Sequence, residues 1–250
     1  MHRVEPNQRG RRRVRTPPSH RRSADDDGDL VRGDAIQSLD HDVLRQRSIQ
    51  VSGAGFITII SIIQGVALAL LADNTFSRPS GLVYAQAAAM LMIFVTVFYF
   101  YVTVTIFLRW APSFLDFFLP FAIAGLEIPP AFFLGDAVKW NGWLGAFWML
   151  TSLGVYQTRL WSPQSHFGND RIAHGLLHRL LRELQLITAA GGTTAISVAI
   201  VGHQAPAYRT WWIIGGVVAM LGTVAMVVAR TELRSSQIYG RYGVHRPIFN

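Results

Sequence analysis

The 250-residue chain contains 50% hydrophobic and only 15% charged residues, carries a net charge of +8, and has no cysteine. Soluble domains contain about 25% charged residues, so this composition excludes a soluble enzyme. The lack of thiols also excludes a secreted protein stabilised by disulfide bonds. The basic residues are 22 arginines and one lysine, from which we expect a bacterial source with a GC-rich genome.

Residues 1–48 form a polar segment that we expect to be a disordered cytoplasmic tail. The segment includes the basic run Arg11–Arg13 and the acidic run Asp25–Asp27, and it has few apolar side chains. Such a segment does not bury enough apolar surface to offset the loss of chain entropy on folding. Its basic residues from Arg9 to Arg15 are either a topology signal or a contact to anionic lipid headgroups. We expect no nucleic-acid binding, because no folded or aromatic element accompanies them.

Six apolar segments follow, and each contains at least 18 residues. A helix of that length crosses a hydrocarbon layer of about 30 Å. Continuous apolar runs lack the alternating pattern of membrane β-strands, whereas helices satisfy their backbone hydrogen bonds internally. The sequence therefore predicts an all-α, polytopic transmembrane bundle of six helices: Val51–Ala72, Val83–Leu108, Ser113–Gly135, Trp140–Gln157, Leu184–Gly202 and Trp211–Ala229.

The segments also define the domain organisation and the orientation. Residues 49–157 contain the first four helices, residues 158–183 a cytoplasmic linker, residues 184–229 the last two helices, and residues 230–250 a basic cytoplasmic tail. With six spans, 20 of the 23 basic residues fall on one side of the membrane, and the other side holds Arg78, Lys139 and Arg209. Because basic residues concentrate on the cytoplasmic side, we predict a protein of the cytoplasmic membrane with both termini inside.

The linker is predicted to contain an amphipathic helix that begins at the candidate N-cap Asn169-Asp170. One side carries Ile172, Leu176, Leu177, Leu180 and Leu181, and the other carries Arg171, His174, His178 and Arg182. We interpret the basic side as a surface that faces anionic lipid, on a helix that lies on the inner leaflet or runs straight into the fifth span. His174 and His178 are four residues apart, but no carboxylate or thiol with ligand spacing accompanies them, so we expect no metal site.

The third segment contains the candidate site, because Asp116 and Glu127 are the only carboxylates within the apolar segments. At 100° per residue, the two residues differ by about 20° around a helix and by roughly 16 Å along its axis. A carboxylate at the membrane centre costs about 2.5 to 3.5 kcal/mol, and no Lys or Arg lies within the six segments. Glu127 is therefore expected to be protonated, hydrated, or matched by a cation from outside.

Three prolines in the same segment, Pro120, Pro129 and Pro130, lack the N–H group that a helix needs. We expect the helix to kink or break just beyond Glu127. The carbonyls of Gly125 and Leu126 would then join the carboxyl group in an oxygen-rich site for protons or small hard cations. The structural alternative is that a protonated Glu127 hydrogen-bonds to a freed carbonyl, while Asp116 pairs with Arg109 at the headgroup level.

The sequence contains none of the common catalytic or nucleotide-binding motifs, and we expect neither an enzyme nor a bound cofactor. The favoured hypothesis is a channel or transporter that passes protons or small cations with Glu127 as the exchanging group. The alternative is a non-transporting membrane subunit or scaffold. Such a protein would bind partner membrane proteins, or a second copy of itself, through small-residue faces such as those at Gly191 and Gly215.

Overall fold

A computed structural model describes residues 55, 57–108, 114–161 and 167–244 of the chain. The described residues form six α-helices, which confirms the predicted all-α bundle. A short 3-10 helix, η2 (Pro206–Tyr208), precedes the last of them. The helices are the first helix (Ile57–Ser77), α2 (Gly81–Phe107), α3 (Phe114–Phe132), α4 (Ala137–Trp161), α5 (Arg171–Gln204) and α6 (Arg209–Arg241). The predicted tail, residues 1–48, lies outside the described residues.

Four of these helices are long and apolar enough to cross a membrane, namely the first helix, α2, α5, and α6 together with η2. The chain is therefore a membrane protein. Contrary to the expectation for all six segments, α3 and α4 are not among the helices that qualify by length and composition in the described residues. α4 includes Lys139, Asn141 and Arg159, and it packs against α3, α5 and α6. A helix enclosed by protein on several sides can carry polar residues that face the bundle interior.

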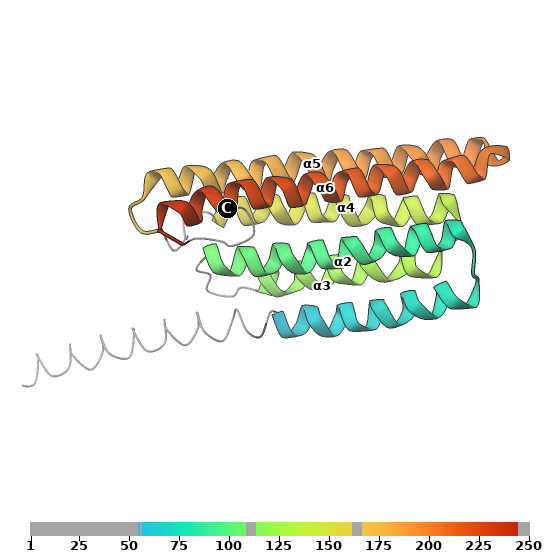
Figure 1. The fold of residues 1–250 in the computed structure, drawn as a ribbon, viewed down its shortest axis with the longest axis horizontal. Coiled ribbons are helices and arrows are strands. Elements are labelled where there is room, and N and C mark those ends of the chain that lie inside the picture. The colour runs from blue at the N-terminus through green and yellow to red at the C-terminus, as the bar shows by residue number, and fades with distance from the viewer. Residues whose placement is uncertain (1–54, 56, 109–113, 162–166, 245–250) are drawn as a thin grey trace, which may run out of the picture. The chain divides into compact units, whose positions relative to one another are not determined.

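Successive helices run antiparallel, so the described chain begins and ends at the same end of the bundle (Figure 1). α4 lies along α5, α5 along α6, and α6 contacts α2, which closes the arrangement. We call the end that contains the start of α5 and the end of α6 the basic end, and the other the opposite end. Among the described residues, the basic end carries Arg159, Arg171, Arg179, Arg182, Arg230, Arg234 and Arg241, and the opposite end carries Arg78, Lys139 and Arg209.

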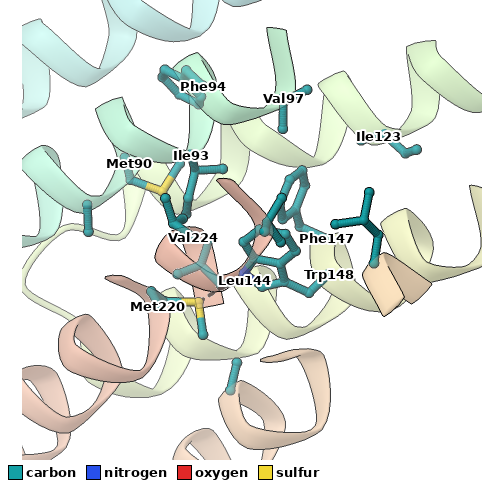
Figure 2. Close-up of a cluster of buried hydrophobic side chains, with 14 of the residues drawn as sticks. Met90, Ile93, Phe94, Val97, Ile123, Leu144, Phe147, Trp148, Met220 and Val224 are labelled. Carbon is teal, nitrogen blue, oxygen red and sulfur yellow. Dashed lines mark hydrogen bonds between the residues drawn. The ribbon is translucent and has the colours of Figure 1, made fainter. Parts of the chain in front are cut away.

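The core of the bundle is an apolar cluster to which all six described helices contribute, and Figure 2 shows part of it. Trp148 of α4 is 1% exposed, and its Nε1 donates to the sulfur of Met220 in α6 over 3.0 Å. The ring of Phe147 packs edge-on against Trp148, with 5.0 Å between ring centroids. The labelled members are Met90, Ile93, Phe94 and Val97 of α2, Ile123 of α3, Leu144, Phe147 and Trp148 of α4, and Met220 and Val224 of α6.

The amphipathic helix of the linker is the first part of α5, which runs unbroken from Arg171 to Gln204. Of the two predicted arrangements, the structure therefore has the one in which the helix continues straight into the fifth span. On its predicted apolar side, Leu177, Leu180 and Leu181 are buried within the bundle and Leu176 is half-buried, whereas Ile172 is exposed. α6 extends alongside, where Nη2 of Arg234 donates to Oε1 of Glu183 over 2.6 Å. The two helices therefore continue as a pair beyond the apolar parts of their sequences.

Asp170 joins the start of α5 to the end of α6. Its Oδ1 caps α5 by accepting from the N–H groups of Ile172 and Ala173, and its Oδ2 lies 3.1 Å from Nη2 of Arg241. The N–H of Ala173 and the guanidinium of Arg241 hold the pKa of Asp170 below its ordinary value, although partial desolvation opposes them. The ionised form therefore stabilises the folded state.

Asp170→Asn is expected to lower the unfolding temperature at neutral pH, because asparagine keeps the cap but loses the ion pair. A carboxyl group whose pKa is lowered by folding stabilises the protein above its unfolded pKa, near 3.9, and this contribution is lost as pH falls through the folded pKa. The difference between the two proteins should therefore shrink as pH falls below about 4 and disappear once the pH is below the folded pKa. Thermal unfolding in detergent at several pH values measures the difference in unfolding temperature between the two proteins. A difference that is independent of pH would contradict a stabilising role for the ionised Asp170.

Small residues allow α4, α5 and α6 to approach closely. A Cβ on Gly145 of α4 would lie 2.5 Å from Cγ1 of Ile196 in α5, and a Cβ on Gly191 would lie 2.6 Å from Cγ2 of Thr223 in α6. Gly216 is covered in the same way by the side chain of Asn141, whereas Gly215 has open space beside it. Several of the predicted small-residue positions therefore pack within the chain.

Candidate functional site

Glu127 lies in the interior of the bundle, where 1% of the residue is exposed. It is thirteen residues from the start of α3 at Phe114 and five from its end at Phe132. These separations correspond to about 20 Å and about 8 Å along the helix axis. The side chain is therefore enclosed by protein rather than facing lipid, and it is well separated from both ends of its helix.

Two polar side chains from other helices lie near the Glu127 carboxyl group. The amide of Gln64, in the first helix, approaches it. The Tyr101 side chain, from α2, lies within electrostatic range of it. Both residues are buried, each with 7% exposed. Three helices therefore place polar groups around one region of an otherwise apolar interior.

The carboxyl group of Glu127 has no hydrogen-bond partner among the described residues, at either Oε1 or Oε2. Gln64 is close enough to interact with the carboxyl group, but no hydrogen bond of ordinary geometry joins them, and Nε2 of Gln64 donates to the backbone carbonyl of Phe94 over 3.0 Å. The ion pairs of the described residues involve other carboxylates: Asp136, Asp170 and Glu183. A carboxyl group in such a place needs a proton, water or a cation that reaches it.

Of the kink or break predicted just beyond Glu127, the break is wrong, because α3 continues past this residue. The helical backbone includes Pro120 and continues through Pro129 and Pro130 to Phe132. The fixed φ of proline is compatible with helical geometry, so a proline can stand within a helix at the loss of one backbone hydrogen bond. The prolines still supply no N–H to the carbonyls of Gly125 and Leu126, and both of these residues are half-buried.

The other predicted carboxylate, Asp116, belongs to the first turn of α3, but its side chain lies outside the described part of the structure. The same holds for the Pro120 side chain and for Arg109, the predicted partner of Asp116. The alignment of Asp116 with Glu127 on one stripe of α3, and the pairing of Asp116 with Arg109, therefore stay predictions.

The four residues predicted to face anionic lipid lie on α5 at the basic end. Arg171, His178 and Arg182 are exposed, and His174 is half-buried. Nε of Arg159 donates to Nε2 of His178 over 3.1 Å, whereas the ring of His174 lies edge-on to Phe167 with 5.9 Å between centroids. The two histidines therefore contact different neighbours. The function of this surface in lipid binding stays a prediction.

Sequence reasoning missed other polar groups in the interior. Gln86 of α2 and Trp140 and Asn141 of α4 are completely buried. Each has one atom without a hydrogen-bond partner in the described residues, namely Nε2 of Gln86, Nε1 of Trp140 and Oδ1 of Asn141. The sequence signal that could have indicated these buried polar groups is a single amide side chain within an apolar run, as at Gln64 and Gln86. That signal does not distinguish a packing role from a functional one.

The described residues also line two cavities elsewhere on the bundle. One of about 830 Å³ lies between α2 and α6 and is lined mainly by apolar residues, including Leu221 and Val228. The second, of about 510 Å³, lies at the opposite end, where α3 ends and α4 begins. Glu127 lines neither cavity, although Phe132, five residues further along α3, lines the second.

No family model, curated protein or solved structure matches the chain. Its function is therefore inferred from the geometry of the described residues. The feature that most needs a functional explanation is the unpartnered carboxyl group of Glu127, because polar groups are costly to keep inside a membrane protein.

Proposed function

We propose that the protein passes protons across the membrane and that Glu127 is the group that takes them up and releases them. The observation that carries this proposal is the burial of both carboxyl oxygens without a hydrogen-bond partner in the described residues. A polar group buried only for packing is normally hydrogen-bonded, since leaving it unsatisfied costs about 1 to 3 kcal/mol. An ionisable residue inside a transmembrane bundle is by default a functional group.

A proton fits this site better than a metal cation. Hard cations such as Ca²⁺ and Mg²⁺ bind about six or more oxygen ligands, whereas a proton needs one oxygen atom. Around Glu127, the side chains identified are the amide of Gln64 and the phenol of Tyr101. α3 is also continuous at this point, so it does not offer the unwound carbonyls that coordinate cations at broken helices in transporters.

We propose that the basic end of the bundle faces the cytoplasm and that the membrane is the cytoplasmic membrane. Among the described residues, seven basic side chains belong to this end and three to the opposite end. Such an asymmetry is what the preference of basic residues for the cytoplasmic side produces. Protons would then pass between the opposite end, about 8 Å along α3 from Glu127, and the more distant basic end.

The alternative function, a scaffold for partner proteins, has less support. It requires small-residue helix faces that are free to receive a partner. Gly191 is covered by Thr223 and Gly216 by Asn141, both within this chain. Gly215 has open space beside it, but one free position does not indicate a partner.

Proton flux into sealed liposomes tests the proposal. Purified protein is expected to dissipate an imposed pH gradient, measured with an internal pH-sensitive dye while potassium and valinomycin carry the compensating charge. Glu127→Gln is expected to reduce the rate to that of protein-free vesicles, because the amide has the shape of the carboxyl group but does not exchange a proton.

Asp73→Asn is the matched control, because Asp73 is an exposed carboxylate near the end of the first helix and its amide should leave the flux unchanged. Equal leak in vesicles with and without the protein would reject proton transport. Undiminished flux in Glu127→Gln would reject Glu127 as the exchanging group. Dissipation of a sodium gradient that Glu127→Gln abolishes would instead favour a cation as the transported species.

A further inference from the structure

The three basic residues at the opposite end of the bundle gather around one cavity. Arg78 follows the first helix, Lys139 lies in the first turn of α4, and Arg209 begins α6, yet all three line the cavity of about 510 Å³. The preference of basic residues for the cytoplasmic side leaves few of them at this end. That preference alone gives no reason for the three to converge, so their convergence points to a ligand.

Specific contacts hold the wall of this cavity in place. Gly135 has a φ of 81°, a conformation that favours glycine, and its N–H donates to Oε1 of Gln86 over 2.6 Å. Nη2 of Arg209 donates to the carbonyl of Gly135. This contact fixes one guanidinium group at the cavity, and its remaining N–H groups are available to a ligand, since arginine has five such donors.

The positive charge of the cavity is only partly neutralised by protein groups. Asp136 is the one carboxylate that lines it. Oδ1 of Asp136 accepts from the N–H groups of Val138 and Lys139, and its Oδ2 lies 4.0 Å from Nζ of Lys139. Arg78 and Arg209 form no ion pair within the described residues. Two guanidinium groups therefore face the cavity without a carboxylate of their own.

We propose that this cavity binds a phosphate group. Guanidinium groups bind phosphate through paired hydrogen bonds, and ammonium groups add a further charge-assisted contact. The cavity is within the range of about 300 to 1,000 Å³ that is common for small-molecule sites. The phosphate comes either from the headgroup of an anionic lipid or from a soluble phosphate compound, because the site lies at the end of a membrane bundle.

Binding measurements on the full chain in nanodiscs test this proposal and separate the two sources. In discs of phosphatidylcholine, titration with inorganic phosphate at physiological salt measures binding of the soluble anion by calorimetry. In detergent, native mass spectrometry measures whether phosphatidylglycerol is retained in preference to phosphatidylcholine. Arg78→Gln and Arg209→Gln are each expected to weaken the binding at least about tenfold, since each removes hydrogen bonds to a charged group.

Arg230→Gln is the control, because Arg230 is an exposed arginine at the basic end, outside the surface predicted to face anionic lipid, and its loss should leave the binding unchanged. Phosphate binding that depends on Arg78 and Arg209 would establish a site for soluble phosphate. Selective retention of phosphatidylglycerol with the same dependence would establish a headgroup site. Absence of both signals, or equal weakening by Arg230→Gln, would overturn the proposal. Arg78 makes no ion pair among the described residues, so its variant remains informative if Arg209→Gln disturbs the Gly135 turn.

Discussion

Gly145→Ala is expected to destabilise the folded protein by about 1 to 3 kcal/mol, the usual cost of overpacking a close-packed interior. The new Cβ would lie 2.5 Å from Cγ1 of Ile196 and 3.1 Å from its backbone nitrogen. Ile196 lies within α5, eight residues from its end at Gln204, so relief of the backbone contact requires the two helices to separate. Denaturation in mixed detergent, monitored by circular dichroism, measures the free energy of unfolding.

Gly142→Ala is the matched control in the same helix and at the same interface. Its Cβ would lie 4.0 Å from Cβ of Ala199, an ordinary contact, so alanine should be neutral or should stabilise by up to about 1 kcal/mol through its helix propensity. Ile196→Ala in the Gly145→Ala background should recover part of the loss, because it removes Cγ1. Equal effects of the two alanine substitutions would show that α4 and α5 do not approach as closely as the contacts at Gly145 require.

Glu127→Leu is expected to increase the free energy of unfolding by about 1 to 3 kcal/mol while abolishing proton flux, because it replaces an unsatisfied buried polar group with an apolar one. Residues kept for function commonly reduce stability in this way. Both quantities are measured on the same preparation, by denaturation in detergent and by flux in liposomes. A gain in stability together with a loss of flux is the combination that a purely structural carboxyl group cannot produce.

Glu183→Leu provides the opposite case, because Glu183 is a carboxylate with a resident partner, Arg234, at 2.6 Å. Its removal leaves a partly buried guanidinium group unpaired, so this variant should be less stable than the natural protein. If Glu127→Leu also lowers stability, Glu127 must have a stabilising partner in the folded protein, and the functional interpretation of its burial would lose its basis.

The helices could be predicted from the sequence because each depends on local properties. Uninterrupted apolar runs between charged borders located all six, and the positions of the arginines predicted two ends of unequal charge, which the described helices also show. The position of Glu127 as a buried acid followed from the same reasoning, because an ionisable residue in an apolar run must avoid lipid.

Properties that depend on how the helices pack could not be predicted in the same way. The proline pair Pro129-Pro130 suggested a kink or break just beyond Glu127, but α3 continues to Phe132, because the fixed φ of proline is compatible with a helix. The proximity of Gln64 and Tyr101 to Glu127 depends on which faces of three helices meet. Arg78, Lys139 and Arg209 line one cavity only because three separate links between helices bring them to the same place. No local pattern in the sequence indicates this.

Infrared difference spectroscopy between two pH values tests most directly whether Glu127 exchanges a proton inside the bundle. The purified protein is predicted to show the C=O stretching band of a protonated carboxyl group that changes with pH, with a position typical of an apolar environment. This band should be absent from Glu127→Gln and present in Asp73→Asn. A spectrum in which Glu127→Gln removes no pH-dependent carboxyl band would contradict proton exchange at this residue.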